Sequence, residues 1–442
     1  MSWDGDGKSY DVYRASTRYG EYTLAQSEVT SGEYVDNSRF CYYKVCETDG
    51  AGEIIEEYAV SEEYSLFGDN VYVFSAADNA DKVSAQIKTV YDGRLSETRS
   101  GEFSEGRSAF LLKPGTYNNK IELNVGYYMT YAGLGESPEA VTVNKLYSGN
   151  RTDAICDNAL CNFWRGAENF TVKSGGTAMW ATSQSSSLRA VKVNGNLQLS
   201  EGGKGTSGGF LADSHITGSV QSGSQQQWLT RNSTMNKWEG NTWNTCFAGV
   251  DGAPSGTYPA NRYTVEDATS MREKPFLTFD ETHGYRIAIP AVRENASGYS
   301  WSEENLDSRI EKYIEQSDIY FAQADRDSAK TINNAYKTHS AVVLTPGVYY
   351  LDEAIEINSN SKVLFGMGLA TLMPLNGNSC LVTTGSDISV SGILVDTGWD
   401  KSNTLASIGK QGNKGSDVRL YDFYFRVGGF LEMDTAADCC LK

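Results

Sequence analysis

The chain has 442 residues, and its 38 basic and 56 acidic side chains give a net charge of −18. This length allows two or three domains with sizeable cores, and the negative charge argues against nucleic acid or an anionic membrane as the main partner. No run of eighteen apolar residues is present, so no membrane-spanning helix is expected. The 44 Gly and 27 Tyr residues favour a β-rich, extracellular protein.

The eight cysteines include no C-x-x-C spacing, so zinc and redox motifs of that kind are not expected. Cys156 and Cys161 flank a short loop, which predicts either a disulfide between them or two buried thiols. Cys41 and Cys46 lie in a strand-like stretch at a spacing that points them to opposite faces, so they are not expected to pair. No cofactor is predicted: calcium would suit the acidic composition, but no calcium-loop motif is present.

Residues 8–48 contain short strands with alternating aromatic residues and regular turn signals. The segments YDVYRAS, GEYTLA, YVDN and CYYKV resemble the later strands of a fibronectin type III domain. The opening strands of such a β-sandwich would precede Met1, so we expect the chain to be part of a longer protein. Residues 1–50 are predicted to be this partial β-sandwich, with a degenerate hairpin module as the alternative, and residues 51–75 a linker.

Two segments of the chain repeat each other. Ala109–Tyr117 (AFLLKPGTY) and Ala341–Tyr349 (AVVLTPGVY) match at five of nine positions with an offset of 232 residues. Downstream, a G-x-G turn at 133–135 matches another at 366–368 with an offset of 233. A near-constant offset across two separate motifs indicates an internal duplication.

An amphipathic helix is predicted upstream of each repeated segment. Apolar residues recur with helical spacing in both places, and polar residues are available to cap each N-terminus. In the first helix the apolar residues are Val83, Ile87, Val90 and Tyr91, and the candidate caps are Asp78 and Asp81. In the second helix they are Ala329, Ile332, Ala335 and Tyr336, with Asp327 or Ser328 as the cap.

The order helix, apolar strand, P-G-x-Y turn, strand, G-x-G turn is typical of the start of a parallel β-helix. Each coil of about 20–25 residues stacks on the next, and the open end of the first coil must be covered. The predicted fold is therefore mainly β, with two tandem right-handed parallel β-helices. The first, with its capping helix, is assigned to 76–250, a connecting segment to 251–326 and the second β-helix to 327–442, which is expected to continue beyond Lys442.

Several longer segments resemble a group of large secreted β-helix proteins of the pectin-lyase-like superfamily. They include NFWRGAENFTV (162–172), GGFLADSHITGSVQSGSQQQWLTRNS (208–233) and LTPGVYYLDEAIEI (344–357), and the resemblance covers about residues 60–435. The tandem plan is similar to glycoside hydrolase family 55, which cleaves β-1,3-glucan from chain ends. The resemblance implies a groove between the two β-helices and a catalytic acid, supplied by the second, that would lie beyond Lys442.

Candidate site residues were sought among polar groups inside strand-like motifs, because stacked coils bring distant residues together. Glycoside cleavage needs two carboxyl groups, and a Trp beside polar side chains suits sugar binding. The predicted catalytic residues are Asp213 and Asp396. The predicted substrate-binding residues are Trp164, Arg165, His215, Gln226, Trp228, Arg231 and Arg426.

Spacing predicts how some of these residues lie. Asp213 and His215 alternate, as do Gln226 and Trp228, so each pair is expected to share one face of a strand. Arg231 is expected to face the other way from Trp228.

Structural alternatives remain open: a polar ladder on the β-helix exterior, an ion pair of Arg165 with Glu168, and a buried ion pair of Asp396 with Arg426. The sequence thus predicts a secreted carbohydrate-active protein with a polysaccharide partner, most specifically a glycoside hydrolase. A non-catalytic glycan-binding module and a polysaccharide lyase are the alternatives.

Overall fold

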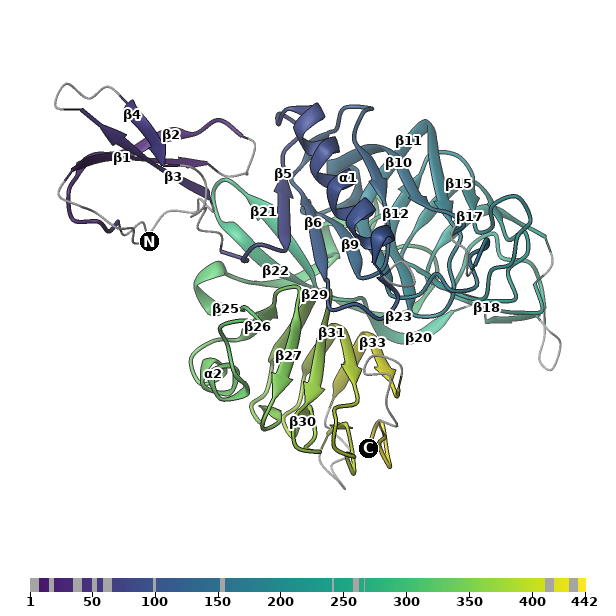
Figure 1. Cartoon of the computed structure of the whole chain (residues 1–442). Helices are drawn as coiled ribbons and strands as arrows, with labels where there is room; N and C mark the ends of the chain where they lie inside the picture. Colours follow the sequence, from purple (N-terminus) through teal and green to yellow (C-terminus); the bar gives the residue numbers. More distant parts are fainter. Residues whose placement is uncertain are drawn as a thin grey trace.

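The computed structural model describes residues 8–15, 20–34, 42–49, 54–58, 66–97, 101–151, 156–240, 242–256, 262–265, 267–409, 417–428 and 436–442. Near the N-terminus lies an antiparallel sheet of order β2-β1-β3-β4. Its strands are β1 (Ser9–Ala15), β2 (Thr23–Val29), β3 (Tyr42–Thr48) and β4 (Ile54–Tyr58). Figure 1 shows this small sheet standing apart from two larger bodies. Cys41 lies outside the described residues, so the expectation that Cys41 and Cys46 do not pair stays a prediction.

The first large body is a stack of parallel strands, as predicted for a β-helix. One face pairs successive strands in parallel from β5 to β19. These strands are β5 (Val71–Phe74), β6 (Ser108–Leu112), β9 (Met129–Gly133), β11 (Arg165–Trp180), β12 (Ser186–Val193), β14 (Phe210–Ala212), β16 (Gln227–Arg231), β18 (Asn244–Ala248) and β19 (Arg262–Val265). A second set packs beside them, namely β7 (Gly115–Thr116), β8 (Glu122–Asn124), β10 (Val141–Ser148), β13 (Leu197–Gln198), β15 (His215–Gln221) and β17 (Thr234–Glu239), with a 3-10 turn, η2 (Pro138–Ala140).

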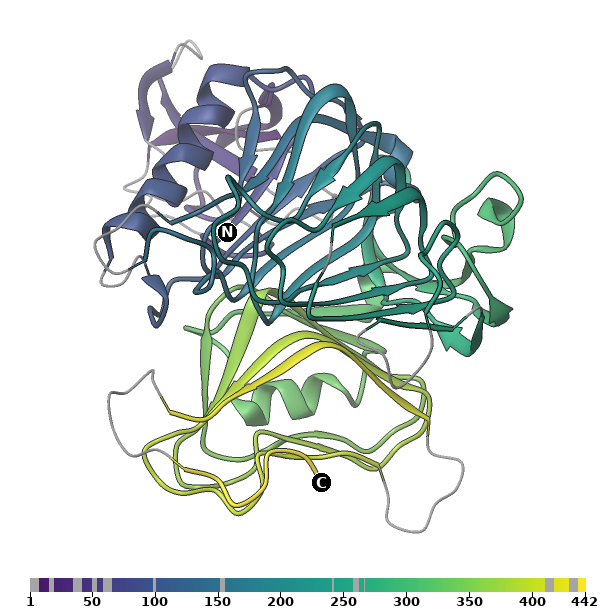
Figure 2. The same cartoon turned by 90° about the vertical axis from the view of Figure 1, so that its right-hand side faces the viewer.

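The second large body repeats this plan (Figure 2). Its main face pairs β25, β26, β29, β31 and β33 in parallel. The strands are β25 (Ile319–Ala322), β26 (Ala341–Leu344), β27 (Val348–Leu351), β28 (Ile355–Ile357), β29 (Val363–Pro374), β30 (Leu381–Thr383), β31 (Ile388–Asp396), β32 (Ala406–Ser407) and β33 (Val418–Arg426). Figure 2 shows this body directly below the first, with its main face turned toward it.

The two matching segments make equivalent turns. The Tyr117 hydroxyl donates to the carbonyls of Phe74 and Lys113, at 2.7 and 2.9 Å. In the second body the Tyr349 hydroxyl donates to the carbonyls of Ala322 and Thr345, at 2.7 and 3.0 Å. The shared P-G-x-Y sequence therefore ties each turn back to the strand of the preceding coil.

Each helix lies upstream of its repeated segment, as predicted, but a strand precedes it, so it is not the first element of its body. Helix α1 (Ala80–Ser96) follows β5, and α2 (Ala329–Ala335) follows β25. Each helix is the crossover that two parallel strands require, and it covers the open end of the core on the way. The cap of α1 is Asn79, whose side chain accepts from the amides of Asp81 and Lys82, whereas Ser328 caps α2 as predicted.

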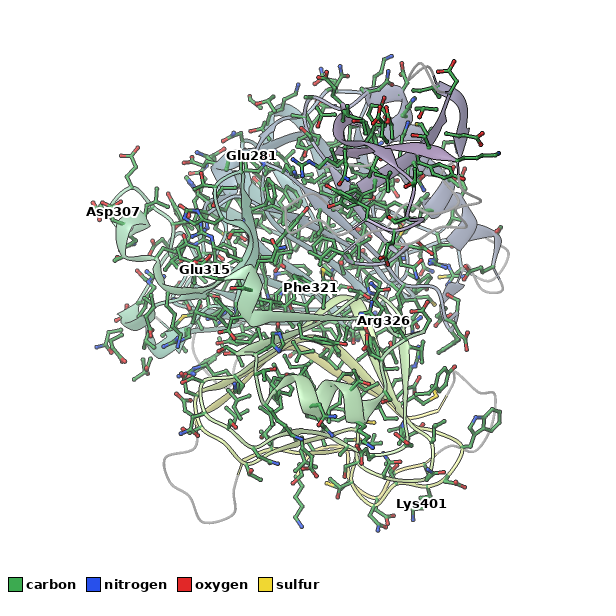
Figure 3. The ribbon with its side chains drawn as sticks, turned by 90° about the vertical axis from the view of Figure 1, so that its left-hand side faces the viewer. Glu281, Asp307, Glu315, Phe321, Arg326 and Lys401 are labelled. Atoms are coloured by element: carbon green, nitrogen blue, oxygen red, sulfur yellow. The ribbon has the colours of Figure 1, made fainter. Side chains whose placement is uncertain are left out.

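A connecting segment links the bodies through antiparallel pairs. Its elements are β20 (Ala268–Arg272), β21 (Phe276–Asp280), β22 (Gly284–Pro290), β23 (Val292–Ala296), η3 (Leu306–Ser308), β24 (Ile310–Ile314) and η4 (Gln316–Asp318). Figure 3 labels Asp307 and Glu281 at the outer side of this segment, and Phe321 where the two bodies meet. Phe321 belongs to an apolar cluster that also contains Leu111 of the first body and Phe365 of the second.

The Ile332 side chain of α2 is fully buried in the core of the second body. Ile332→Ala should therefore lower the free energy of unfolding by about 2–5 kcal/mol, because the cavity adds to the lost apolar burial. Lys330→Ala, at an exposed position of the same helix, is the matched control and should change it by less than ~0.5 kcal/mol. Urea denaturation measures both, and equal small effects would show that α2 does not seal the core.

Candidate ligand-binding groove

A groove of about 500 Å³ lies on the outer face of the first body, over the strands that follow β12. One wall is a column of residues that are register partners on successive strands, so they lie about 4.8 Å apart. This column is Ser187, Phe210, Leu229, Cys246 and Tyr263. All but Ser187 line the groove, and Tyr424 of β33 lines it from the second body.

A second column supplies amide groups. Gln227 and Asn244 are register partners at the start of β16 and β18, and both line the groove with Gln184. The Gln184 side chain donates to Ser207 at 3.1 Å, which fixes its direction. The groove therefore presents three carboxamides along one edge and aromatic and aliphatic faces along the other.

Two glycines keep this edge of the groove open. Gly208 and Gly209 have φ values of +111° and +148°, a region that residues with a Cβ atom rarely adopt. A Cβ on Gly209 would lie 2.3 Å from the ring of Trp228. The Gln225 side chain accepts from the Gly208 amide at 2.8 Å and holds the turn in place.

The described residues that line the groove include no charged side chain. Aromatic faces pack on the C–H surface of a sugar, while amides and hydroxyls exchange hydrogen bonds with its hydroxyl groups. Burying an unpaired charge here would be costly, because the described lining offers no counter-charge. The chemistry of the groove thus suits a neutral, hydroxyl-rich ligand.

The predicted sugar platform Trp228 lies at the groove but points inward. Its side chain is 3% exposed, belongs to the main core and donates from Nε1 to Thr230 at 3.1 Å. Gln226 lies just before β16 and accepts from the Ser207 hydroxyl at 3.0 Å. Only the ring edge of Trp228 reaches the groove, beside Gly209.

Asp213 and His215 do not share a strand face, contrary to the spacing argument. Asp213 has a φ of +51°, so the chain turns a corner between β14 and β15. Asn169, Ala190 and Asn232 have the same left-handed conformation at the matching corners of neighbouring coils. His215 stacks on Tyr299 instead, with ring centroids 4.7 Å apart.

The Asp213 carboxylate holds the connecting segment. It accepts from the Ser300 amide and hydroxyl, at 2.5 and 2.8 Å, and lies 3.7 Å from Arg309. Burial, reinforced by the charge of Glu273, raises the pKa of Asp213 to about 7 despite these partners. The carboxyl group does not line the groove.

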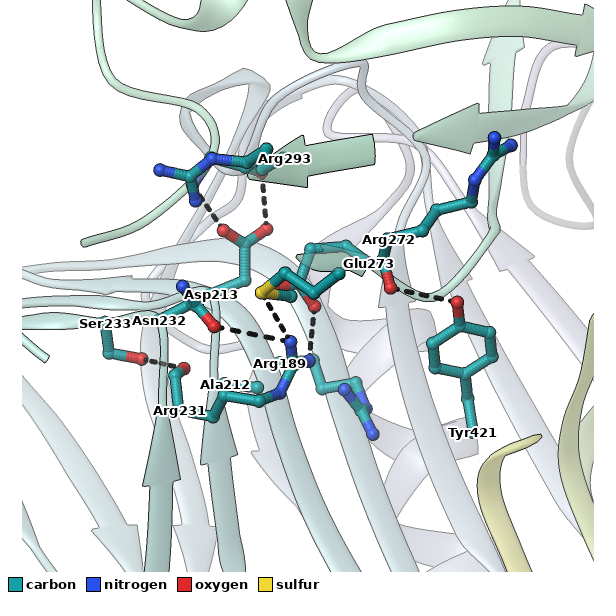
Figure 4. Close-up of polar contacts among 12 residues, drawn as sticks. Arg189, Ala212, Asp213, Arg231, Asn232, Ser233, Arg272, Glu273, Arg293 and Tyr421 are labelled. Carbon is teal, nitrogen blue, oxygen red and sulfur yellow. Dashed lines mark hydrogen bonds and ion pairs between the residues drawn. The ribbon is translucent and has the colours of Figure 1, made fainter. Parts of the chain in front are cut away.

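Arg231 faces away from Trp228, as predicted. Its guanidinium donates to Glu273 at 2.7 Å and contacts the Met271 sulfur (Figure 4). It lies in the column next to the groove wall, where its register partners are Ala212 and Ala248.

The predicted ion pair of Asp396 and Arg426 is confirmed. The two residues are register partners on β31 and β33, and Arg426 Nε donates to Asp396 at 2.9 Å in a fully buried position. Burial raises the pKa of Asp396, and the Arg426 charge opposes this effect. Arg426 also donates to the Tyr128 hydroxyl and lies 5.4 Å from the Trp164 ring, so the structure brings these predicted residues together.

The expected pairing of Arg165 with Glu168 is wrong. Arg165 points inward and donates to the Val125 carbonyl at 2.6 Å and to Ser148 at 3.0 Å. Glu168 binds Lys274 of the connecting segment at 2.6 Å. Residues three apart on this strand point to opposite sides of the sheet, which explains the difference.

The catalytic and binding roles predicted for these side chains stay predictions. The amides Gln184, Gln227 and Asn244 and the rings of Tyr263 and Tyr424 were not among the predicted site residues. Aligning the coils by their left-handed corners would have placed Gln227 and Asn244 in one column, but the corner residues differ in type and give a weak signal.

The structure forms no disulfide between Cys156 and Cys161, and burial together with a hydrogen bond to Cys156 raises the pKa of the Cys161 thiol to about 11. The described residues include no group of three or more acidic, His or Cys side chains placed to hold a metal ion. Nor is any described helix long and apolar enough to span a bilayer.

Comparison with known proteins finds a matching family model and one curated relative. Residues 320–439 match the family described as LAM55 pectate lyase-like domain. The chain is 38% identical over 373 residues to an exo-β-1,3-glucanase of Streptomyces sp. (strain SirexAA-E / ActE). The match covers 82% of this chain and 59% of that protein, so the chain spans less than two thirds of the relative's length.

Solved structures agree on the fold. The structure of sacteLam55A from Streptomyces sp. SirexAA-E superimposes with a TM-score of 0.75 at 36% identity, covering 82% of this chain and 65% of that one. A variant of the same protein in complex with glucose gives a TM-score of 0.74 with the same identity and coverage. The fold of this chain is therefore a pectate-lyase-like parallel β-helix.

The Asp213 pKa predicts a pH-dependent stability. A carboxyl group that titrates near pH 7 when folded and near 4 when unfolded stabilises the fold below pH 4, and that contribution is lost as the pH rises through 7. The wild type should therefore lose up to ~4 kcal/mol relative to Asp213→Asn between pH 4 and 7. Urea denaturation of both proteins across this range measures the difference, and parallel curves would contradict the prediction.

The buried ion pair predicts a strong asymmetry between single and double variants. Asp396→Ala leaves the Arg426 charge buried and should cost about 3–5 kcal/mol of unfolding free energy. Asp396→Leu combined with Arg426→Met removes both charges and should cost clearly less. Thermal or urea unfolding compares them, and an equal cost would show that Arg426 finds another counter-charge.

Proposed function

We propose that this chain forms the substrate groove of a glycoside hydrolase that acts on β-1,3-glucan from chain ends. The observation that carries the proposal is the uncharged groove of amides and aromatic rings on the first body, completed by Tyr424 of the second. Glucan is a neutral polymer of hydroxyl-bearing rings, which these groups suit. The similarity to an exo-β-1,3-glucanase over most of the chain supports the same activity.

The groove chemistry favours a hydrolase over a lyase. A polysaccharide lyase needs a base and a cation that neutralises the uronate carboxylate. No Lys, Arg, Asp or Glu lies among the described residues that line the groove, and a uronate would enter it unpaired. A neutral glucan avoids that penalty.

Hydrolysis requires two carboxyl groups, one kept protonated. The predicted catalytic residues Asp213 and Asp396 lie outside the groove in buried contacts with Ser300 and Arg426. We propose that both act mainly by positioning the walls of the groove. Because no described lining residue carries a carboxyl group, a non-catalytic glucan-binding module is the second candidate.

We further propose an extracellular location and a fibronectin type III-like role for the N-terminal module. The net charge of −18 and the Gly- and Tyr-rich composition support the location. The antiparallel order β2-β1-β3-β4 is compatible with part of a β-sandwich.

Groove variants should weaken glucan binding. Asn244→Ala removes a carboxamide, Tyr263→Ala removes an aromatic face, and each should raise Kd for a β-1,3-linked glucose oligosaccharide about 5–10-fold. Trp399→Ala, a 55% exposed ring outside the groove lining, is the control and should leave Kd unchanged. Isothermal titration calorimetry measures all three.

Product analysis separates the candidate activities. Glucose released from β-1,3-glucan, with no ultraviolet-absorbing unsaturated product, is the expected outcome for a hydrolase. Binding without any product would support the second candidate instead. Absence of binding to every β-1,3-glucan would refute both.

A further inference from the structure

A second hollow, of about 470 Å³, lies beside the groove. Its walls come from both bodies and from the connecting segment, and they are rich in guanidinium groups. We name it the arginine hollow after the residues that shape it: Arg189, Phe210, Arg231, Arg272, Arg419 and Tyr421. Phe210 lines both the hollow and the groove, so the two are contiguous across one side chain.

The stacked register explains this contiguity. The groove wall contains Phe210 and Leu229, and the next outward column contains Arg189 of β12, Ala212 of β14 and Arg231 of β16. Alternate residues of a strand lie about 7 Å apart, so the arginine column follows the groove wall at the distance of one side-chain row. A ligand that crosses the Phe210 ring passes directly from one hollow to the other.

Each guanidinium of the hollow is already oriented by a carboxylate. Arg189 makes a bidentate pair with Asp422, and Arg231 donates to Glu273 at 2.7 Å. Arg272 donates to Glu311 at 2.6 Å. Figure 4 shows three of these guanidinium groups, with the contacts of Arg231 to Glu273 and of Tyr421 to the Arg272 carbonyl.

These pairs also cancel the charge of the hollow. Arg419, the fourth cation, pairs with Asp387 at 3.1 Å and with Asp417. An anionic ligand would therefore have to compete with carboxylates already in place. A neutral ligand with hydroxyl groups can use the remaining donors without breaking any pair.

Two arginine donors of the hollow, Arg189 Nη1 and Arg272 Nε, are buried without a hydrogen-bond partner among the described residues. Arg189 uses Nε and Nη2 on Asp422, and its Nη1 is buried with no hydrogen-bond partner among the described residues. A buried unsatisfied donor is costly, so such a group points to a ligand or water that completes it. Phe210 and Tyr421 add apolar ring surface beside it.

We propose that the arginine hollow is a second sugar-binding region, which holds a further stretch of the same neutral glucan chain that occupies the groove. This inference rests on the proposed function, because it takes the glucan as the occupant. Recognition of the glucan then extends beyond the uncharged groove onto ion-paired guanidinium groups. Affinity should therefore increase with chain length after the groove itself is filled.

The test fills the hollow without touching its ion pairs. Ser270 lines the hollow and is exposed on β20, so Ser270→Trp blocks it sterically. Val292, 41% exposed on β23, also lines it, and Val292→Trp is an independent second block. Thr269→Trp is the matched control, because Thr269 is exposed on the same strand but does not line the hollow.

Calorimetry with β-1,3-linked glucose oligosaccharides of two to eight units gives the readout. For the longest oligosaccharide, both blocking variants should raise Kd about tenfold relative to Thr269→Trp, with no change for the two-unit probe. The inference fails if the blocking variants match the control at every length, or if they weaken the short and long probes equally.

The Asn244→Ala groove variant separates this failure from failure of the proposed function. If Asn244→Ala weakens binding while Ser270→Trp and Val292→Trp bind normally, only the second sugar-binding region is refuted. If no oligosaccharide binds the wild type, both proposals are refuted.

Discussion

The contact between the two parallel sheets is the constraint on which the rest of the structure depends. Leu111 of the first sheet and Phe365 of the second meet in one apolar cluster. The buried pair of Arg189 with Asp422 then fixes the lateral position of β33 opposite β12. The groove opens over the strands beyond β12, so its width is set by where this pair holds β33.

Parallel register turns this contact into a binding surface. In a β-helix the outward positions of successive coils stack in columns, so the residues of one column together decide the character of a strip. The Phe210 column is largely apolar, the Gln227 column supplies amides, and the Arg189 column supplies cations that are neutralised by carboxylates. Three strips of different chemistry thus lie side by side on one face.

Much of the fold could be predicted from the sequence, because apolar strands recur along the chain and a P-G-x-Y turn lies near the start of each body. The ion pair of Asp396 with Arg426 was also within reach, since both residues end apolar strands on adjacent coils. The groove could not be predicted, because the corners that set the register are single left-handed residues of several types. Asp213 is an example. On a continuous strand it would share a face with His215, whereas its positive φ turns the chain and separates the two side chains.

The Gly208–Gly209 corner has a further implication for how such a surface can change. Because every coil contributes one residue to each strip, inserting or deleting a whole coil would lengthen or shorten the strips by about 4.8 Å while leaving the remaining pairs in register. A larger residue at Gly209 would instead displace the Trp228 ring and narrow one spot only. The number of coils therefore sets the length of ligand that the surface contacts, and single corner residues set its local width. The two can change independently.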